Sequence, residues 1–381
     1  MVLGKSLFDA KGKLLLAAGH RLDKEYIFKI AARQFHTVFI YKAGTEEVLP
    51  EDLISEELRA ITSQKLQENI DELQKLVMKV LPKTGENLAR ALRESAYFDN
   101  VLNMKELSPQ MKFIVEEVMS LGASKKLGGT LRSAGSFEYE HALEVMLISI
   151  KLGMLYSYSY QELLHLGTAG LLHDIGKTVI PEIAEKSKDE LSLDERIMLR
   201  EHPVFSSILI EKSSEGMYKE QAAVLQHHEQ QNGKGYPLKK IGFNLPPVKS
   251  DKAEPNRIFR FSEIIAVADA YDNYASPRPG HAPMSPEQAY KNVKKKATTI
   301  LNSHIVDKLA EIVDFYPRGS LVKVERCGDP RWVGCTGAVK DYRKIPLKAE
   351  IVFFLDGKGA EMEPVIHEFK GDLRLKLDII M

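Results

Sequence analysis

The feature that most constrains this chain is a set of metal-binding side chains scattered through its middle. Its clearest parts are the runs HDIGK at residues 173–177, HHE at 227–229 and GYP at 235–237. Side chains of adjacent residues point about 100° apart around a helix, so the His and the Asp of the first run cannot share a helix face. Both reach one centre if they stand at a helix end, which the glycine of the same run favours.

Five histidines and two aspartates of this region are enough ligands for two metal ions. The neighbouring imidazoles of His227 and His228 repel each other when charged, unless a metal holds both neutral. Asp269 lies in an apolar helical stretch, where a lone carboxylate is costly, so it is either paired or bound to metal. Ordinary structural roles also suit His141, which opens an amphipathic helix, and His202, which precedes a proline and resembles a helix cap.

The mixture of imidazole and carboxylate ligands, without thiolate, suits iron, manganese or a similar divalent ion. Zinc is not favoured, because the chain has no HExxH-like pair of histidines. Two ions about 3.5–4 Å apart hold a hydroxide between them and stabilise an in-line displacement at phosphorus. Lys177, one helical turn after His173, would neutralise a phosphate oxygen. The alternative interpretation is that Lys177 is an ordinary solvated lysine after a helix end.

Apolar periodicity changes along the 381 residues and predicts a mainly α-helical protein with two small flanking modules. Residues 1–50 favour a small mixed α/β regulatory module, and residues 51–125 a helical connector. Residues 126–317 favour the helical domain that carries the histidines, and residues 318–381 a small β-rich module.

Within the first two segments, residues 5–16 favour a hairpin that turns at 9–12, followed by a helix at 24–32 and a strand at 37–41. A long helix is expected at 53–81, stopped by the following proline, with two further helical stretches at 86–107 and 109–121. The apolar stripe of the long helix either packs on the protein's own next helix, which is favoured, or forms a dimerising coiled coil. This stripe consists of Leu66, Ile70, Leu73, Val77 and Val80.

Capping boxes predict helix starts at Ser159 and Ser192, and a Ser-Pro pair predicts a third at Ser285. A polar stretch at 245–257 is expected to form a loop beside the site. Four short strands are expected in the last segment, at 320–324, 337–342, 349–355 and 375–380.

The bulk properties exclude some classes of protein. A net charge of zero argues against a protein that coats a nucleic-acid polymer, and the lysine run at 294–296 is interpreted as a solvated helix face. No apolar run is long enough to cross a bilayer, and residues 1–19 lack a signal-peptide core, so a cytoplasmic location is expected. Cys327 and Cys335 lie in a predicted hairpin, where two reduced thiols are favoured over a bridge.

Taken in order, these motifs resemble the HD-GYP family, the branch of the HD phosphohydrolases that degrades cyclic di-GMP in bacteria. The resemblance covers about half of the chain. It is carried by His141, HDIGK, His202-Pro203, HHE, GKGYP at 233–237 and DAYD at 269–272. HD alone is common to many nucleotide hydrolases, whereas HDIGK, HHE and GYP in this order are specific.

The resemblance implies a helical HD-type bundle that binds two divalent ions, iron or manganese, and hydrolyses cyclic di-GMP to pGpG and in some members onward to GMP. Members with a third metal carry a glutamate four residues before the first histidine. Phe137 stands at that position, so two metals are expected. The implied ligands are His141, His173, Asp174, His202, His227, His228 and Asp269.

The resemblance also implies roles for individual side chains. Asp174 would hold both ions and, with Lys177, serve catalysis. The implied substrate contacts are Lys177, Tyr236, Asp272 and Arg278, although GYP also forms a tight turn whatever its function. The implied partners are a cyclic dinucleotide, GGDEF-type or other signalling proteins, and a second copy of the chain.

The sequence departs from the family pattern in its substrate clamp. Arg278 is kept, but Gly280 replaces the usual aromatic residue and His281 the second cation; Asn232 and Asn273 are further departures. Two alternatives follow: a weakly active or inactive receptor or docking module for cyclic dinucleotides, and a hydrolase of another cyclic dinucleotide. An HD phosphohydrolase for ordinary nucleotides is less favoured because of the GYP run.

Overall fold

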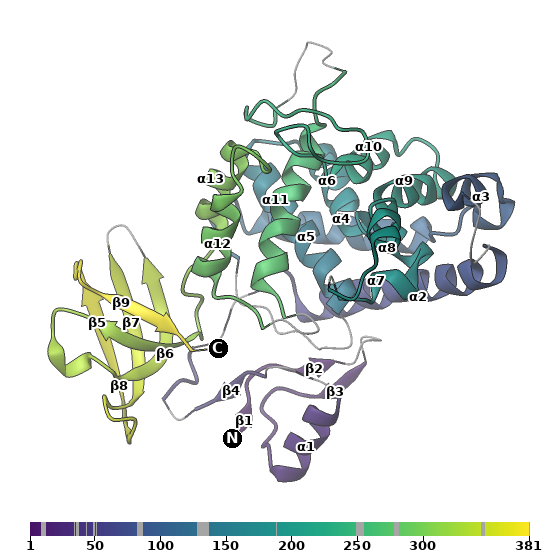
Figure 1. Cartoon of the computed structure of the whole chain (residues 1–381). Helices are drawn as coiled ribbons and strands as arrows, with labels where there is room; N and C mark the ends of the chain where they lie inside the picture. Colours follow the sequence, from purple (N-terminus) through teal and green to yellow (C-terminus); the bar gives the residue numbers. More distant parts are fainter. Residues whose placement is uncertain are drawn as a thin grey trace.

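The helical middle of the chain forms the body of the molecule, and a small module from each end of the chain lies beside it (Figure 1). The computed structural model describes residues 1–8, 13–33, 35, 38–42, 44–48, 50, 52–81, 87–127, 137–187, 189–248, 255–277, 282–343 and 347–380. In these residues the predicted class, a helical bundle with a mixed N-terminal module and a β-rich C-terminal module, is confirmed. None of the described helices is long and apolar enough to span a bilayer.

The body is built from helices that share one large hydrophobic core. They are α2 (Glu56–Val80), α3 (Leu88–Glu94), α4 (Met104–Ser120), α5 (Phe137–Leu155), α6 (Tyr160–Leu172), α7 (Pro181–Ala184), α8 (Leu193–Leu199), α9 (His202–Ser213), α10 (Tyr218–Gln226), α11 (Arg260–Ala275), α12 (Pro286–Lys295) and α13 (Ser303–Ile312). Helix α5 lies at the centre and contacts α2, α4, α6, α11 and α13. Because α5 carries His141, the first predicted ligand is anchored in the core.

Helix α2 uses its apolar stripe inside the molecule. Leu66, Ile70, Leu73 and Val77 are buried in the core of the body, where α2 contacts α4 and α5. The prediction that the stripe packs on the protein's own helices is therefore confirmed, and the stripe is not free to form a coiled coil with a second chain. The start of the helix is capped by Ser55, and the proline expected to stop it lies outside the described residues.

The next two helical stretches are divided differently from the prediction. The stretch expected at 86–107 is a short α3, a 3₁₀ turn at Ala96–Phe98 and the first turn of α4, which continues to Ser120 with Pro109 inside it. Pro109 is the sixth residue of α4, so the helix passes through it without the hydrogen bond that an N–H at this position would donate to the Lys105 carbonyl. Elsewhere the capping boxes at Ser159 and Ser192 and the start at Ser285 are confirmed.

The N-terminal module pairs β1 (Val2–Leu3) with β4 (Ile40–Tyr41) and β2 (Leu7–Phe8) with β3 (Leu14–Leu16), and α1 (Lys24–Ala32) spans the predicted residues. The predicted turn at 9–12 lies outside the described residues. The loop expected at 245–257 has no helix or strand in its described part.

The C-terminal module is a five-stranded antiparallel sheet in the order β8-β7-β6-β5-β9. Its strands are β5 (Leu321–Arg326), β6 (Thr336–Arg343), β7 (Lys348–Leu355), β8 (Glu361–Lys370) and β9 (Lys376–Ile379). Four were predicted, whereas β8 was missed because it contains Pro364 and many charged residues. Such a sequence is tolerated at a sheet edge, where β8 lies. Cys327 and Cys335 are buried free thiols, as favoured from the sequence.

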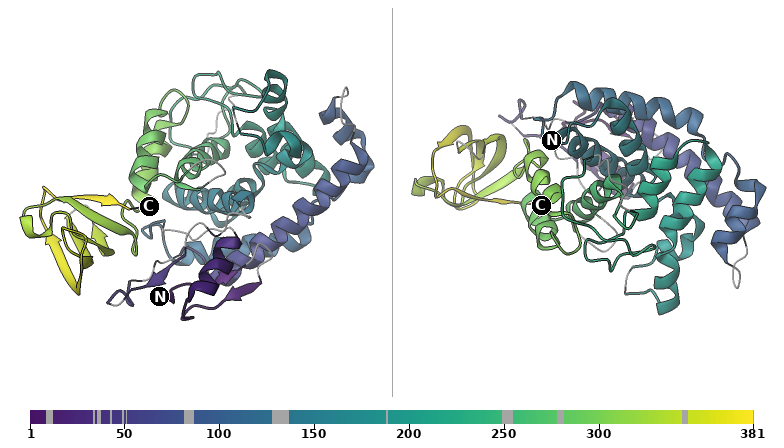
Figure 2. Two further views of the ribbon diagram at one scale, coloured as in Figure 1. Left: turned by 60° about the horizontal axis from the view of Figure 1, so that its bottom comes forward. Right: turned by 90° about the horizontal axis from the view of Figure 1, so that it is seen from above.

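The two small modules contact each other. Val48 packs with Ala338, Val352 and Phe354 on one face of the C-terminal sheet, and the ammonium of Lys42 lies 4.3 Å from the centre of the Phe354 ring. The other face of the sheet carries its own hydrophobic cluster, around Val339. Both faces of the sheet are thus covered by apolar contacts, and the sheet stands to one side of the helical body (Figure 2).

Candidate metal centre

The seven predicted ligands come from separate elements and converge between α5, α6, α9, α10 and α11. His141 lies on α5, His173 caps the end of α6, and Asp174 follows it at the start of a 3₁₀ helix, η3 (Ile175–Val179). The remaining ligands are His202 at the first position of α9, His227 and His228 directly after α10, and Asp269 on α11. The helix-end position predicted for His173 and Asp174 is confirmed.

A close backbone contact seats this helix end on α9. A Cβ atom at Gly176 would lie 2.1 Å from the carbonyl oxygen of His202 and 2.5 Å from the amide nitrogen of Ser206, so only glycine fits. The Ser206 hydroxyl accepts a hydrogen bond from the Gly176 N–H at 2.9 Å and donates one to the His173 carbonyl at 2.8 Å. These contacts therefore fix the position of the His173-Asp174 turn relative to His202.

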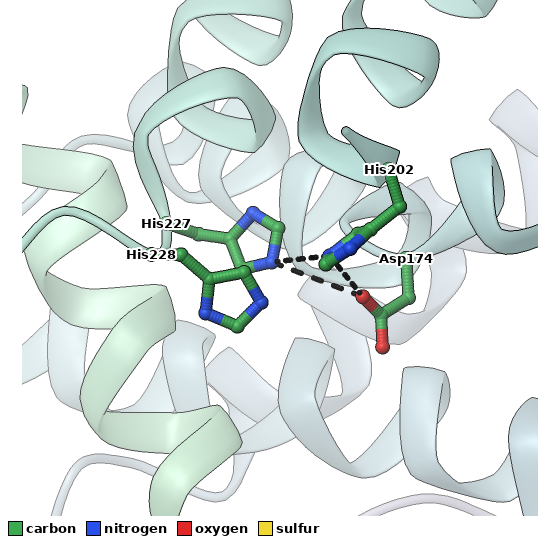
Figure 3. A group of neighbouring side chains, drawn as sticks. All are labelled: Asp174, His202, His227 and His228. Atoms are coloured by element: carbon green, nitrogen blue, oxygen red, sulfur yellow. Dashed lines mark hydrogen bonds and ion pairs between the residues drawn. The ribbon is translucent and has the colours of Figure 1, made fainter. Parts of the chain in front are cut away.

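The ligands form two groups, and the carboxylate of Asp174 lies between them. One group is Asp174, His202, His227 and His228, and the other is His141, His173 and Asp269; in each, the ligand atoms lie within 4.8 Å of one another. Figure 3 shows how Asp174 faces the first group of histidines. Oδ1 of Asp174 is 3.1 Å from His202 Nε2 and 3.8 Å from His227 Nε2.

The second oxygen of Asp174 faces the other group. Oδ2 is 3.3 Å from His173 Nε2 and 3.9 Å from His141 Nε2. Asp269 Oδ1 completes this group at 3.3 Å from His141 Nε2. One carboxylate thus offers one oxygen to each of two adjacent donor sets, which is the arrangement of a ligand that bridges two ions.

The histidines are oriented by hydrogen bonds on their far ring nitrogens. Nδ1 of His173, His202 and His227 each lies 2.6–2.8 Å from the carbonyl oxygen three residues earlier, on Gly170, Leu199 and Val224. Each carbonyl accepts the Nδ1 proton, which leaves Nε2 as the free acceptor that a metal requires. A histidine that ends or begins a helix can bond in this way to its own chain.

The electrostatics of His227, His228 and Asp174 agree with metal ligation, whereas the carboxylates of Asp269 and Asp272 outweigh burial and raise the pKa of His141 to about 9. Burial, together with the charge of the neighbouring imidazoles, lowers the pKa of His228 to about 3 and that of His227 well below its ordinary value. Burial alone would raise the pKa of Asp174, but the charges of His173 and Lys177 hold this pKa well below its usual range. Anionic carboxylates and neutral imidazoles are the protonation states that bind metals.

The residues present fit a pair of divalent cations. Among the described residues, two buried ligand atoms, His173 Nε2 and Asp174 Oδ1, have no hydrogen-bond partner, and a buried polar atom without a partner is costly. All seven donors are nitrogen or oxygen, with no thiolate, which suits borderline or hard divalent ions. The structure therefore contains two clusters that can hold metal ions.

Lys177 and Tyr236 lie beside the centre, where they were predicted. The ammonium of Lys177 forms an ion pair with Asp174 Oδ2, and its side chain remains 36% exposed. The Tyr236 ring packs against His228, with centroids 4.8 Å apart. The GYP loop is held by the buried Glu229, whose carboxylate accepts hydrogen bonds from the N–H groups of Leu238 at 2.6 Å and Lys240 at 2.9 Å.

Asp272, predicted as a substrate contact, is buried behind the ring of His141. It is 2% exposed, and its Oδ2 is 2.8 Å from Nδ1 of His141, on the side of that ring away from Asp174 and Asp269. Asp272 therefore orients His141, a role that was not predicted for it from the sequence. Asn273, predicted only as a departure from the family, donates to Asp269 Oδ1 at 2.5 Å. Arg278 and the rest of the predicted clamp, residues 278–281, lie outside the described residues.

Replacement of Asp272 by alanine is expected to weaken metal binding about 10–100-fold, because His141 loses the acceptor that fixes its ring and tautomer. Metal content after titration with a chelator measures the effect. Asp272→Asn keeps a neutral acceptor and should lose less. Unchanged metal affinity in Asp272→Ala would show that His141 needs no support or is not a ligand.

Comparisons with known proteins agree with this geometry. The family model described as an HD domain matches residues 137–303, which contain all seven ligands. A cyclic di-GMP phosphodiesterase from Pseudomonas aeruginosa is 26% identical over 199 residues, which cover 51% of this chain and 44% of that protein. A 3'3'-cGAMP-specific phosphodiesterase from Vibrio cholerae is 24% identical over 219 residues, 57% of this chain and 37% of that protein.

The fold and the centre thus define an HD domain. With the HDIGK, HHE and GYP runs in one site, the chain resembles members of the HD-GYP family over this domain. It spans less than half the length of the two relatives above. A solved structure of an HDG"Y"P protein from Bdellovibrio bacteriovorus overlaps 81% of this chain and 96% of its own, at 12% identity and a TM-score of 0.45.

Proposed function

We propose that this chain is a metal-dependent phosphodiesterase that hydrolyses a cyclic dinucleotide, with cyclic di-GMP as the first substrate to test and pGpG, or further GMP, as the product. The observation that carries the proposal is the position of Asp174, whose two oxygens face two adjacent sets of ligands. The names of the relatives support a cyclic dinucleotide as substrate. They also support 3'3'-cGAMP as an alternative to cyclic di-GMP.

The ligands form two sets, one for each of two metal ions. His202, His227 and His228 would hold one, His141, His173 and Asp269 the other, and Asp174 both. When bound, a pair of divalent cations lowers the pKa of a water and stabilises the charge that develops on the attacking and leaving oxygens. We propose iron or manganese for both positions, because the donors are imidazole and carboxylate.

Lys177 places a positive charge beside the reacting phosphate. Burial opposes its charged form, but the neighbouring carboxylates, above all Asp174, raise the pKa of Lys177 above its ordinary value, so the ammonium stays charged. A fixed cation stabilises a phosphate whose negative charge grows during the reaction. Tyr236 closes one side of the centre against His228.

The test is turnover of cyclic di-GMP by anaerobically purified protein loaded with iron or manganese, with metal content measured on the same sample. The expected result is two metals per chain and release of pGpG or GMP. Failure to bind metal would overturn the ligand assignment.

Metal without product from cyclic di-GMP would overturn that substrate. A panel that includes 3'3'-cGAMP then separates a hydrolase of another cyclic dinucleotide from a receptor, because a receptor binds without hydrolysis. The altered run at 278–281 favours the receptor as second candidate.

A further inference from the structure

Arg200 is an exposed cation beside the metal centre that has no part in the chemistry described above. It caps the end of α8, and the carbonyl of the preceding residue, Leu199, accepts the hydrogen bond from Nδ1 of the ligand His202. Within the part of the chain that the structure describes, its side chain contacts the Tyr236 ring and forms no ion pair. Its charge is therefore available to an anion that reaches the centre.

The Tyr236 ring holds this guanidinium near the ligands. The guanidinium carbon lies 5.6 Å from the ring centroid, within the range of a cation–π contact. The same ring packs on the ligand His228, and the GYP loop that carries it is fixed by Glu229. Gly235 allows this tight packing, since a Cβ there would lie 2.4 Å from the Cα of Glu229. A continuous set of contacts thus links the metal centre to Arg200.

The chemistry of a cyclic dinucleotide calls for a second cationic contact. Such a substrate carries two phosphodiesters, and only one of them is cleaved at a time. The phosphate that is cleaved would lie at the metal centre, beside Lys177. The other phosphate lies on the opposite side of the macrocycle and keeps its full negative charge. A guanidinium suits it because its forked N–H groups match two phosphate oxygens.

We propose that Arg200, held against Tyr236, binds the second, non-scissile phosphate of the cyclic dinucleotide; the proposal rests on the function proposed above. Two features favour a phosphate over a base as its partner. The side chain has a formal charge that no described carboxylate neutralises, and its contact with Tyr236 restricts its rotamers before binding, which lowers the entropic cost of the contact.

The experiment compares metal-loaded wild-type protein with Arg200→Ala, Arg200→Lys and a matched control, Arg93→Ala. Arg93 is an exposed arginine on α3, distant from α8 in sequence, and no described residue pairs with its side chain. Two quantities are measured: the Kd of a bis-phosphorothioate analogue of cyclic di-GMP by calorimetry, and kcat and KM for cyclic di-GMP and for bis(4-nitrophenyl) phosphate, which has a single phosphodiester.

Arg200→Ala is expected to raise the Kd of the analogue and the KM for cyclic di-GMP about tenfold, since hydrogen bonds to charged groups are the strong ones. Arg200→Lys should lie between it and wild type, because it keeps the charge but not the fork. The loss of kcat/KM should be at least about fivefold smaller for bis(4-nitrophenyl) phosphate, and Arg93→Ala should match wild type.

An unchanged Kd for the analogue in Arg200→Ala would overturn the proposal. Equal losses on both substrates would also overturn it, because Arg200 would then act through His202 and the metals. If the wild type binds the analogue but does not hydrolyse cyclic di-GMP, the phosphodiesterase function fails, and a raised Kd in Arg200→Ala still supports the phosphate contact. Wild-type protein that does not bind the analogue would overturn both proposals.

Discussion

Replacement of Asp174 by alanine is expected to remove both metals and, with them, all turnover of cyclic di-GMP. Each oxygen of this carboxylate faces one ligand set, at 3.1 Å from His202 Nε2 and 3.3 Å from His173 Nε2, so both sets lose a donor at once. The loss of metal affinity should exceed the roughly 10–100-fold that is typical when a residue that only hydrogen-bonds to a metal ligand is removed. Metal content and turnover measured on one sample give the result.

A matched control for this experiment is Asp189→Ala, because Asp189 is exposed and no described residue pairs with its carboxylate. It should keep both metals. If Asp174→Ala retained two metals and turnover, the bridging role would be wrong. Retention of one metal would show that one of the two ligand groups binds without the shared carboxylate.

Replacement of Gly176 by alanine is expected to destabilise the protein by about 2–3 kcal/mol and to lower metal content, because the new methyl group overlaps backbone atoms. Its Cβ would meet the carbonyl of His202 at 2.1 Å and the amide nitrogen of Ser206 at 2.5 Å, so α9 must shift and carry His202 away from Asp174. Chemical denaturation and metal analysis measure the two effects.

Two further variants make this prediction decisive. Gly4→Ala is the control, since a Cβ there has no neighbour closer than 3.4 Å, and it should be nearly neutral. Ser206→Ala removes the hydroxyl that links Gly176 to His173 without adding any atoms. This variant should therefore fold normally but bind metal less tightly than the wild type. Wild-type stability in Gly176→Ala would show that the contact with α9 is looser than described.

The clustering of the seven candidate ligands could be predicted because their residue types are rare in helix interiors and occur in short runs, such as HDIGK and HHE. The groups that orient these ligands could not be predicted. The acceptors for His173, His202 and His227 are backbone carbonyls, which any sequence provides, and only the fold decides which are free. The sequence holds a signal for Asp272 in its spacing of three residues from Asp269, but the same spacing also suits a substrate contact.

The fold shows the same division between local and distant information. Helix starts were predicted well, because a capping serine and its partner lie within one turn, as at Ser159 and Ser192. The division of residues 86–121 was wrong, since packing decides whether a helix passes through Pro109. Strand β8 was missed because its pairing with β7 compensates for a sequence that would not form a strand alone.

The contact between the two small modules affects how the protein can be shortened. Val48 from the first fifty residues fills the same cluster as Ala338, Val352 and Phe354 from the last sheet. Removal of either module would leave the apolar side of the other in water, where it becomes a surface for aggregation. Shortened proteins should therefore lose both modules or neither, and poor solubility after a single deletion would be a result of this uncovered surface rather than evidence of a catalytic defect.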